Sequence, residues 1–169
     1  GWSPLGLPGK NRFTITDAII VRGVSTHIRA EHPGLVLEFQ KELRIENSAL
    51  VVLDGPSLIF GVPPVVRDNG RLEITGPLTL NVPLALTTNG VISIDGALTS
   101  TVPVNMVGGN LSLDQLVAPE LSLSNGAVLT CPASTTNQMH KLEIDVAGTI
   151  TVSTNSRIDV SGKGYLPGR

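Results

Sequence analysis

The sequence predicts an all-β protein, a single-stranded right-handed parallel β-helix (β-solenoid) in which each coil takes about 20 residues and contributes three short strands. Three observations predict it. Val-Pro pairs recur at twenty-residue intervals, at Val62-Pro63, Val82-Pro83 and Val102-Pro103. Asn69-Gly70 and Asn89-Gly90 keep the same spacing. Between these marks lies a strand-like unit that ends in a turn and recurs four times, at residues 50–55, 72–76, 92–96 and 111–115.

The recurring units alternate between apolar and more polar residues, as expected of strands with one buried face. Residues at alternate positions of these units form two inward columns, and the residues between them form a more polar outward column. The first inward column is Val51, Leu72, Ile92 and Leu111, the second is Leu53, Ile74, Ile94 and Leu113, and the outward column is Val52, Glu73, Ser93 and Ser112. Helices are excluded because apolar residues do not recur at intervals of three and four, and because a proline every twenty residues would break them.

The prolines and the Asn-Gly pairs are expected at the corners of each coil. Proline cannot donate to a sheet ladder, so Pro63, Pro83 and Pro103 are placed at the start of the third strand, counted from the recurring unit. Asn-Gly then turns the chain back to the next recurring unit, since both residue types tolerate positive φ.

Composition narrows the function. The chain has 169 residues, of which 41% are hydrophobic and 3% aromatic, with 18 Gly, 12 Pro and a formal net charge of −2. No Lys or Arg occurs between Arg71 and Lys141, so the clustered cations of a nucleic-acid surface are missing there. No apolar run approaches the ~18 residues of a membrane span. The single cysteine, Cys131, excludes an internal disulfide but not secretion.

The regularity of the pattern changes along the chain. Residues 1–12 are rich in Gly and Pro and are expected to be a linker or an N-terminal cap; both readings stay open. Residues 13–47 form a less regular β region without the twenty-residue marks, and residues 48–169 form the regular solenoid. A polar, turn-rich stretch at 130–140 is interpreted as a lateral loop, where binding functions tend to reside. No closing cap is visible after Gly162, so the solenoid is expected to be truncated at its C-terminus.

The final quarter of the chain carries a resemblance. Residues 126–130, 142–152 and 157–165 resemble segments of very large bacterial secreted proteins, including some with RHS repeats, although the Tyr-Asp signature of those repeats is absent. The twenty-residue coils are more loosely similar to the solenoids of filamentous-haemagglutinin-type adhesins. These resemblances imply an extracellular rod or shell, and they bring no catalytic motif with them.

The sequence assigns no catalytic, cofactor-binding or metal-binding residue. Asp54, Asp95 and Asp114 share one corner position, which Thr75 interrupts, and we interpret them as turn residues. A weak calcium ladder is the alternative, although a broken column offers few of the six to eight oxygens that calcium takes. The three histidines, His27, His32 and His140, are interpreted as surface residues without a role, and Cys131 as a buried free thiol.

The sequence therefore predicts a structural solenoid module of an extracellular bacterial filament, adhesin or giant secreted protein, not an enzyme and without a cofactor. Its expected partners are copies of itself, associating end to end, or neighbouring domains of a longer chain. A glycan or host-surface ligand is possible, and nucleic acid and a membrane span are not expected. The alternative is a carbohydrate-active or glycan-binding parallel β-helix.

Overall fold

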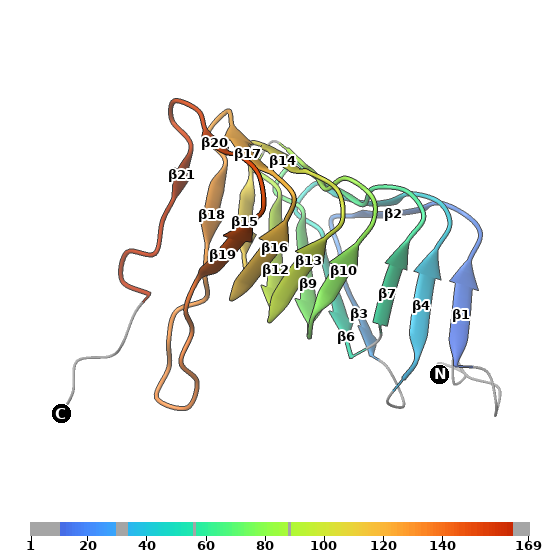
Figure 1. Ribbon diagram of the computed structural model, residues 1–169. Coiled ribbons are helices and arrows are strands. Elements are labelled where there is room, and N and C mark those ends of the chain that lie inside the picture. The colour runs from blue at the N-terminus through green and yellow to red at the C-terminus, as the bar shows by residue number, and fades with distance from the viewer. Residues whose placement is uncertain (1–10, 30–33, 56, 88, 164–169) are drawn as a thin grey trace.

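A computed structural model describes residues 11–29, 34–55, 57–87 and 89–163. In these ranges the chain forms strands and no helix, and every strand pairs in parallel with its neighbours. Successive strands run around three sides, and each circuit of three strands is one coil. The coils stack side by side into a rod, with β1 and β21 at opposite ends (Figure 1). The predicted parallel β-solenoid is confirmed.

The strands fall into three groups that follow the rod axis. Side one consists of β1 (Arg12–Ile15), β4 (Val36–Phe39), β7 (Ser57–Phe60), β10 (Leu78–Leu80), β13 (Ala97–Ser100), β16 (Gln115–Ala118) and β19 (Glu143–Val146). Side two consists of β2 (Ile19–Arg22), β5 (Leu43–Glu46), β8 (Val65–Val66), β11 (Ala85–Leu86), β14 (Val104–Val107), β17 (Leu121–Ser124) and β20 (Ile150–Val152). Side three consists of β3 (Ser25–Arg29), β6 (Leu50–Asp54), β9 (Arg71–Thr75), β12 (Val91–Asp95), β15 (Asn110–Ser112), β18 (Val128–Thr130) and β21 (Arg157–Ile158).

Side three is one continuous seven-stranded sheet, and its register measures the length of each coil. Neighbouring Cα partners run through Thr26, Val51, Leu72, Ile92, Leu111, Leu129 and Ile158, so successive coils take 25, 21, 20, 19, 18 and 29 residues. The first inward column is thereby confirmed. The last interval is long because it contains the lateral loop.

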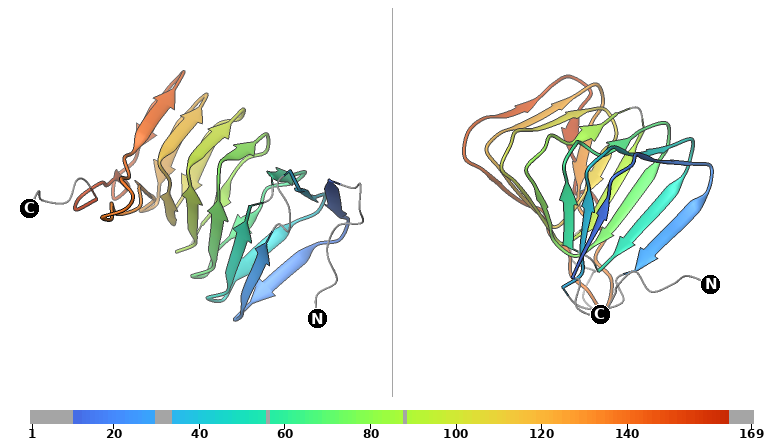
Figure 2. Two further views of the ribbon diagram at one scale, coloured as in Figure 1. Left: turned by 90° about the horizontal axis from the view of Figure 1, so that it is seen from below. Right: turned by 90° about the vertical axis from the view of Figure 1, so that its right-hand side faces the viewer.

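The strands of successive coils enclose a common interior that runs along the rod (Figure 2), and the buried apolar side chains of the core fill it. Both predicted inward columns are buried, since each of their members is 3% exposed or less. The outward column Val52, Glu73, Ser93 and Ser112 pairs in register on the other face of the sheet and is only partly buried. Phe39 and Phe60 of successive coils stack with their ring centroids 5.2 Å apart. Each coil therefore buries its apolar face against its neighbours.

At the corner before side three, the backbone of the preceding coil leaves room only for glycine. Asn69 and Asn89 have φ of 61° and 58°, as expected, but the following glycines are not in the positive-φ region. A Cβ added to Gly90 would lie 2.2 Å from the carbonyl oxygen of Val66 in the preceding coil, and one on Gly70 would lie 2.3 Å from that of Ile45. The expectation of positive φ at both residues is therefore wrong for the glycines.

The prolines lie where the sequence placed them. Pro63, Pro83 and Pro103 immediately precede or closely precede β8, β11 and β14, the third strand counted from each recurring unit. Because these prolines stand before the strands, their missing N–H groups do not interrupt the pairing of β8, β11 and β14.

The region at 13–47 joins the same sheets. The strands expected there are present as β1, β4 and β5, and β1 and β2 pair in register with β4 and β5. The first coil is the longest of those without the lateral loop, which explains why the twenty-residue marks are missing here. Residues 1–10 of the expected linker or cap lie outside the described residues.

Candidate functional site

Four residues at the end of side three form a corner column, which we define as Asp54, Thr75, Asp95 and Asp114. Asp54, Thr75 and Asp95 are register partners at the ends of β6, β9 and β12, and Asp114 follows β15 at the same corner. The column thus runs along one edge of the rod, with three carboxylates interrupted by a hydroxyl.

Both carboxylate oxygens of Asp54 accept hydrogen bonds from residues of the rod. Its Oδ1 accepts a hydrogen bond from the Thr75 hydroxyl at 2.7 Å, and its Oδ2 accepts one from Arg29 Nε at 2.9 Å. The Thr75 hydroxyl and the Arg29 guanidinium together hold the pKa of Asp54 below its usual range. This carboxylate therefore joins three coils, and Thr75, which breaks the acidic pattern in the sequence, links it to the next coil.

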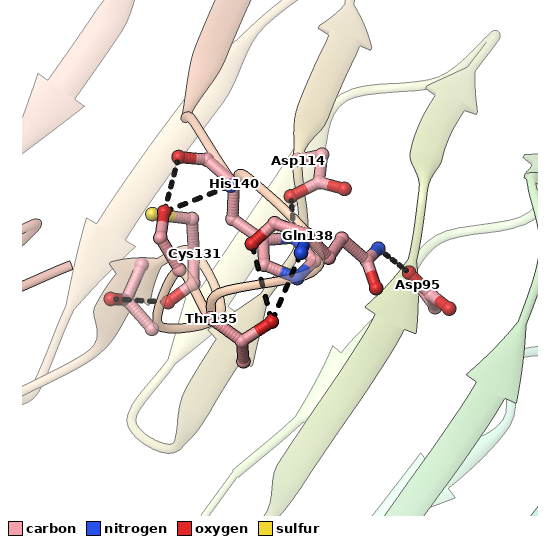
Figure 3. Close-up of polar contacts among 8 residues, drawn as sticks. Asp95, Asp114, Cys131, Thr135, Gln138 and His140 are labelled. Atoms are coloured by element: carbon pink, nitrogen blue, oxygen red, sulfur yellow. Dashed lines mark hydrogen bonds and ion pairs between the residues drawn. The ribbon is translucent and has the colours of Figure 1, made fainter. Parts of the chain in front are cut away.

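The predicted lateral loop is present, and its residues fold back toward the corner column (Figure 3). No strand is assigned between β18 and β19, a span that includes residues 131–142. Ser134 closes the loop, since its Oγ donates to the His140 carbonyl oxygen and accepts from the His140 N–H at 3.0 Å. A second turn forms inside it, where Thr135 Oγ1 accepts from the Gln138 N–H at 3.0 Å.

Two side chains of the loop dock on the column. His140 Nδ1 lies 2.8 Å from Asp114 Oδ1, and Gln138 Nε2 donates to Asp95 Oδ1 at 3.3 Å. The side chain of His140 is only 7% exposed, so the interpretation of this histidine as a surface residue is wrong. His27 is a surface residue as expected, with its side chain 55% exposed, and His32 lies outside the described residues.

A groove of about 270 Å³ lies between the docked loop and side three. Its floor includes the outward residues Val52, Glu73 and Ser93 of three successive coils, and the loop contributes Pro132, Gln138 and His140. The groove therefore combines apolar side chains, among them Ile74, Ile94 and Pro132, with carboxylate, amide and imidazole groups. Sequence reasoning missed it, because only the folded loop brings residues 132–140 against coils forty to eighty positions earlier.

Cys131 begins the loop and is buried, with 2% of its surface exposed, as predicted. Burial raises the pKa of its thiol, and the nearby Asp114 carboxylate raises it further. Both effects favour the protonated thiol over the nucleophilic thiolate. The arrangement gives Cys131 a packing role at the base of the loop.

Three ion pairs, one on each side of the rod, join the first coil to the second. Arg12 on side one donates to Glu38 at 2.8 Å, Arg22 on side two donates to Glu46 at 2.5 Å, and Arg29 on side three donates to Asp54. Glu46 also accepts from Arg67 Nη2 of the third coil at 2.6 Å, although it is only 3% exposed. Arg22 and Arg29 are the direct register partners of Glu46 and Asp54, whereas the partner of Glu38 is Thr14, two residues after Arg12.

Within residues 11–29, 34–55, 57–87 and 89–163, no group of three or more His, Cys, Asp or Glu side chains is placed to hold a metal ion. The corner column is not such a group. The residues with a described position also include no apolar helix of the length that crosses a bilayer.

No family model, curated protein or solved structure matches this chain. The assignment to the parallel β-solenoids thus comes from its strand pairing and buried columns. The resemblance to RHS-associated proteins and to haemagglutinin-type adhesins stays a prediction.

Proposed function

We propose that this chain is a structural solenoid module of an extracellular bacterial filament, adhesin or giant secreted protein, and that it does not act as an enzyme. The observation that supports this most is the unbroken sheet of side three, which runs through seven strands from β3 to β21. A core that is built coil on coil makes a rod whose length is set by repetition. A spacer or shell segment needs that property.

An extracellular location fits the interior of the rod. Stability comes from stacked aliphatic columns and from the ion pairs of the first coil, and neither depends on a disulfide. The one thiol of the sequence, Cys131, is buried and so protected from oxidation in an oxidising compartment. The resemblance of residues 126–165 to giant secreted proteins points in the same direction.

The ends of the rod support assembly with neighbours. In the last coil, Ile150, Val152 and Ile158 are 40–47% exposed, whereas their register partners Leu121, Leu123 and Leu129 are 0–1% exposed. These side chains lie on the inward face of their strands and have no further described coil to pack on. A module of a longer assembly would bury them.

A second candidate function is glycan binding or carbohydrate chemistry in the groove beside the lateral loop. The observation that favours it is the position of Glu73, Asp95 and His140 around a groove of about 270 Å³ that Val52, Ile74 and Ile94 also line. Sugars combine hydroxyl groups with apolar ring faces, and such a lining offers partners for both. A glycan array followed by calorimetry tests this candidate, with the His140→Ala variant expected to lose any binding found.

The module function is tested on intact cells of the source organism. Antibodies against the rod, applied before and after permeabilisation, should label the surface of intact cells or material in the culture supernatant. Surface protease should remove that label. Labelling that requires permeabilisation would overturn the extracellular assignment, and a hydrolase or lyase activity that Glu73→Gln and Asp95→Asn both abolish would overturn the structural one.

A further inference from the structure

The last coil ends in an apolar face that spans all three sides of the rod. β19, β20 and β21 are each the terminal strand of their sheet, so each has one edge without a described neighbour. Their inward residues are Ile144, Val146, Ile150, Val152 and Ile158, each paired with an inward residue of the preceding coil. Ile150, Val152 and Ile158 are large exposed hydrophobics, and Ile144 and Val146 are partly buried.

The first coil presents the complementary face at the other end of the rod. Its inward residues Phe13, Ile15, Ile19, Val21 and Ile28 pair with buried residues of the second coil but are themselves exposed or partly buried. Since all strands are parallel, the free edge of the last coil and the free edge of the first coil have the relation that successive coils have inside the rod.

The dimensions of the two coils match. Inward residues that begin the three sides are Ile144, Ile150 and Ile158 in the last coil, at intervals of 6 and 8 residues, and Phe13, Ile19 and Thr26 in the first coil, at intervals of 6 and 7. Inside the rod, a coil with intervals of 6 and 8 is already followed by a coil with intervals of 6 and 7. Leu78, Leu84 and Ile92, at intervals of 6 and 8, are followed in the next coil by Leu98, Val104 and Leu111, at 6 and 7.

Charge is complementary when a second copy is placed on the last coil in this register. Continuing the side-three column sets Ile158 opposite Thr26, and therefore Asp159 opposite His27 and next but one to Arg29. On side one, aligning Ile144 with Phe13 sets Glu143 opposite Arg12.

The first-coil arginines retain donors for such partners. Arg12 and Arg29 bond Glu38 and Asp54 of the second coil through Nε, and their side chains are 55% and 76% exposed. A guanidinium carries five N–H donors, so the terminal N–H groups of these side chains can donate to a carboxylate that approaches from the opposite direction. Glu143 and Asp159 already pair with Lys141 and Arg157 of their own coil, and their side chains are 49% and 35% exposed. Because a carboxylate has about four acceptor sites, both can also accept from an arginine of a second copy.

From these observations we propose that the last coil binds the first coil of a second copy of this chain, head to tail and in register, so that the strand pairing of all three sides and the core continue from one copy into the next. This inference rests on the proposed function and adds to it the partner and the pairing. The occupant is a second copy because one molecule carries both complementary faces, and because a heterologous contact of this kind repeats into a filament.

Disulfide trapping between copies tests the register. In a Cys131→Ala background, Ser25→Cys with Arg157→Cys places two outward thiols opposite each other across the proposed contact. Neighbouring strands are about 4.8 Å apart, within the Cα range of a disulfide. The matched control, Ser25→Cys with Asp159→Cys, shifts one thiol by two residues and to about 8 Å. Asp159→Ala is added to the aligned pair and Arg157→Ala to the shifted pair. Both pairs then lack the Arg157–Asp159 ion pair and the Asp159 carboxylate, and they differ only in register.

The aligned pair should form a ladder of covalent oligomers under mild oxidation, at least tenfold faster than the shifted pair. Equal rates would overturn the register. Rapid dimerisation of Arg157→Cys alone would overturn head-to-tail pairing and indicate contact between two last coils.

Association itself is measured by light scattering over a wide concentration range, with two adjacent substitutions in β20. Val152→Asp places a charge on the apolar face and should weaken association at least tenfold. Thr151→Asp, on the outward parity of the same strand, should change it less than twofold. A wild-type protein that stays monomeric throughout would overturn this inference, whereas surface labelling of cells would still support the module function.

Discussion

Gly90 illustrates how coil stacking constrains single residues. Its amide donates to the Thr87 carbonyl at 2.9 Å, and the chain then passes so close to the preceding coil that a Cβ would lie 2.2 Å from the Val66 oxygen. The obstacle is backbone, which cannot rotate away as a side chain can. Asn89, just before it, has a φ of 58°. At this corner, Asn89 therefore meets a conformational requirement, a positive φ, and Gly90 meets a spatial one, the absence of a Cβ.

We therefore expect Gly90→Ala to lower the free energy of unfolding by about 1–3 kcal/mol, as overpacking does. Asn89→Gly should change it by less than about 0.5 kcal/mol, because glycine adopts the same φ without strain. Urea unfolding followed by circular dichroism measures both. If Asn89→Gly proved the more harmful of the two, the conformational requirement would outweigh the spatial one.

At the scale of strands, the first coil is joined to the second by ion pairs on all three sides. The Arg12 guanidinium lowers the pKa of Glu38, Arg22 and Arg67 lower that of Glu46, and Thr75 with Arg29 lowers that of Asp54. A carboxylate whose pKa is lower in the folded state stabilises the fold above its unfolded pKa of about 4. That stabilisation is lost as the pH falls through the lower, folded pKa.

The thermal midpoint should therefore fall steeply below about pH 4. Glu46→Gln should unfold at a lower temperature than the wild type at pH 7, because it leaves Arg22 and Arg67 without their carboxylate. The difference in thermal midpoint between the variant and the wild type should narrow as the pH falls, since acid neutralises the wild-type Glu46 as well. Calorimetry between pH 7 and pH 2 measures it, and a gap independent of pH would contradict the assignment.

The lateral loop is held on the rod by a small number of side-chain contacts. His140→Ala removes the contact with Asp114, a bond to a charged partner worth roughly 1.5 kcal/mol. We expect amide hydrogen exchange in residues 131–142 to become about tenfold faster, while exchange in β12 and β15 stays unchanged. Met139→Ala, which alters an exposed side chain 53% accessible to solvent, is the control. Equal exchange in the two variants would show that His140 does not hold the loop.

The strands were largely predictable from sequence, and the site was not. Parity and a constant repeat identified Val51, Leu72, Ile92 and Leu111 as one buried column, because inward residues of a solenoid recur locally. The burial of His140 depends on a loop that folds back to Asp114 of the adjacent coil, and no period encodes such a contact. The ion pairs of the first coil were hidden because its longer length displaces each arginine from the twenty-residue pattern.

On the scale of the whole molecule, the rod is a one-dimensional array. Each coil is stabilised by its neighbours, so stability is expected to be nearly additive along the axis. A coil is then a unit that can be removed, provided that the inward and outward parities stay in phase. The register offers a place to do this, because Glu73 and Ser93 are direct Cα partners on β9 and β12.

Deleting residues 73–92 joins Leu72 to Ser93 and removes one coil of twenty residues in phase. Ser93 then takes the outward position of Glu73, and Ile94 the inward position of Ile74. We expect this variant to fold with a parallel-sheet circular dichroism spectrum and to unfold cooperatively. Its urea m-value should be smaller in proportion to the surface of the missing coil. Asp95 and Asp114 are retained, so the lateral loop should still dock.

Deleting residues 73–91, one residue fewer, joins Leu72 to Ile92 and reverses the parity of that strand. Ile92 and Ile94 then face solvent, and Ser93 faces the core. Because a slip of one residue exchanges the two faces of a strand, this variant should be several kcal/mol less stable than the longer deletion, although it retains more of the chain. Side-by-side urea unfolding and dye binding to exposed apolar surface measure the difference. If the two deletions were equally stable, the corners would be absorbing the extra residue, and the stability of the rod would not depend on the register of side three.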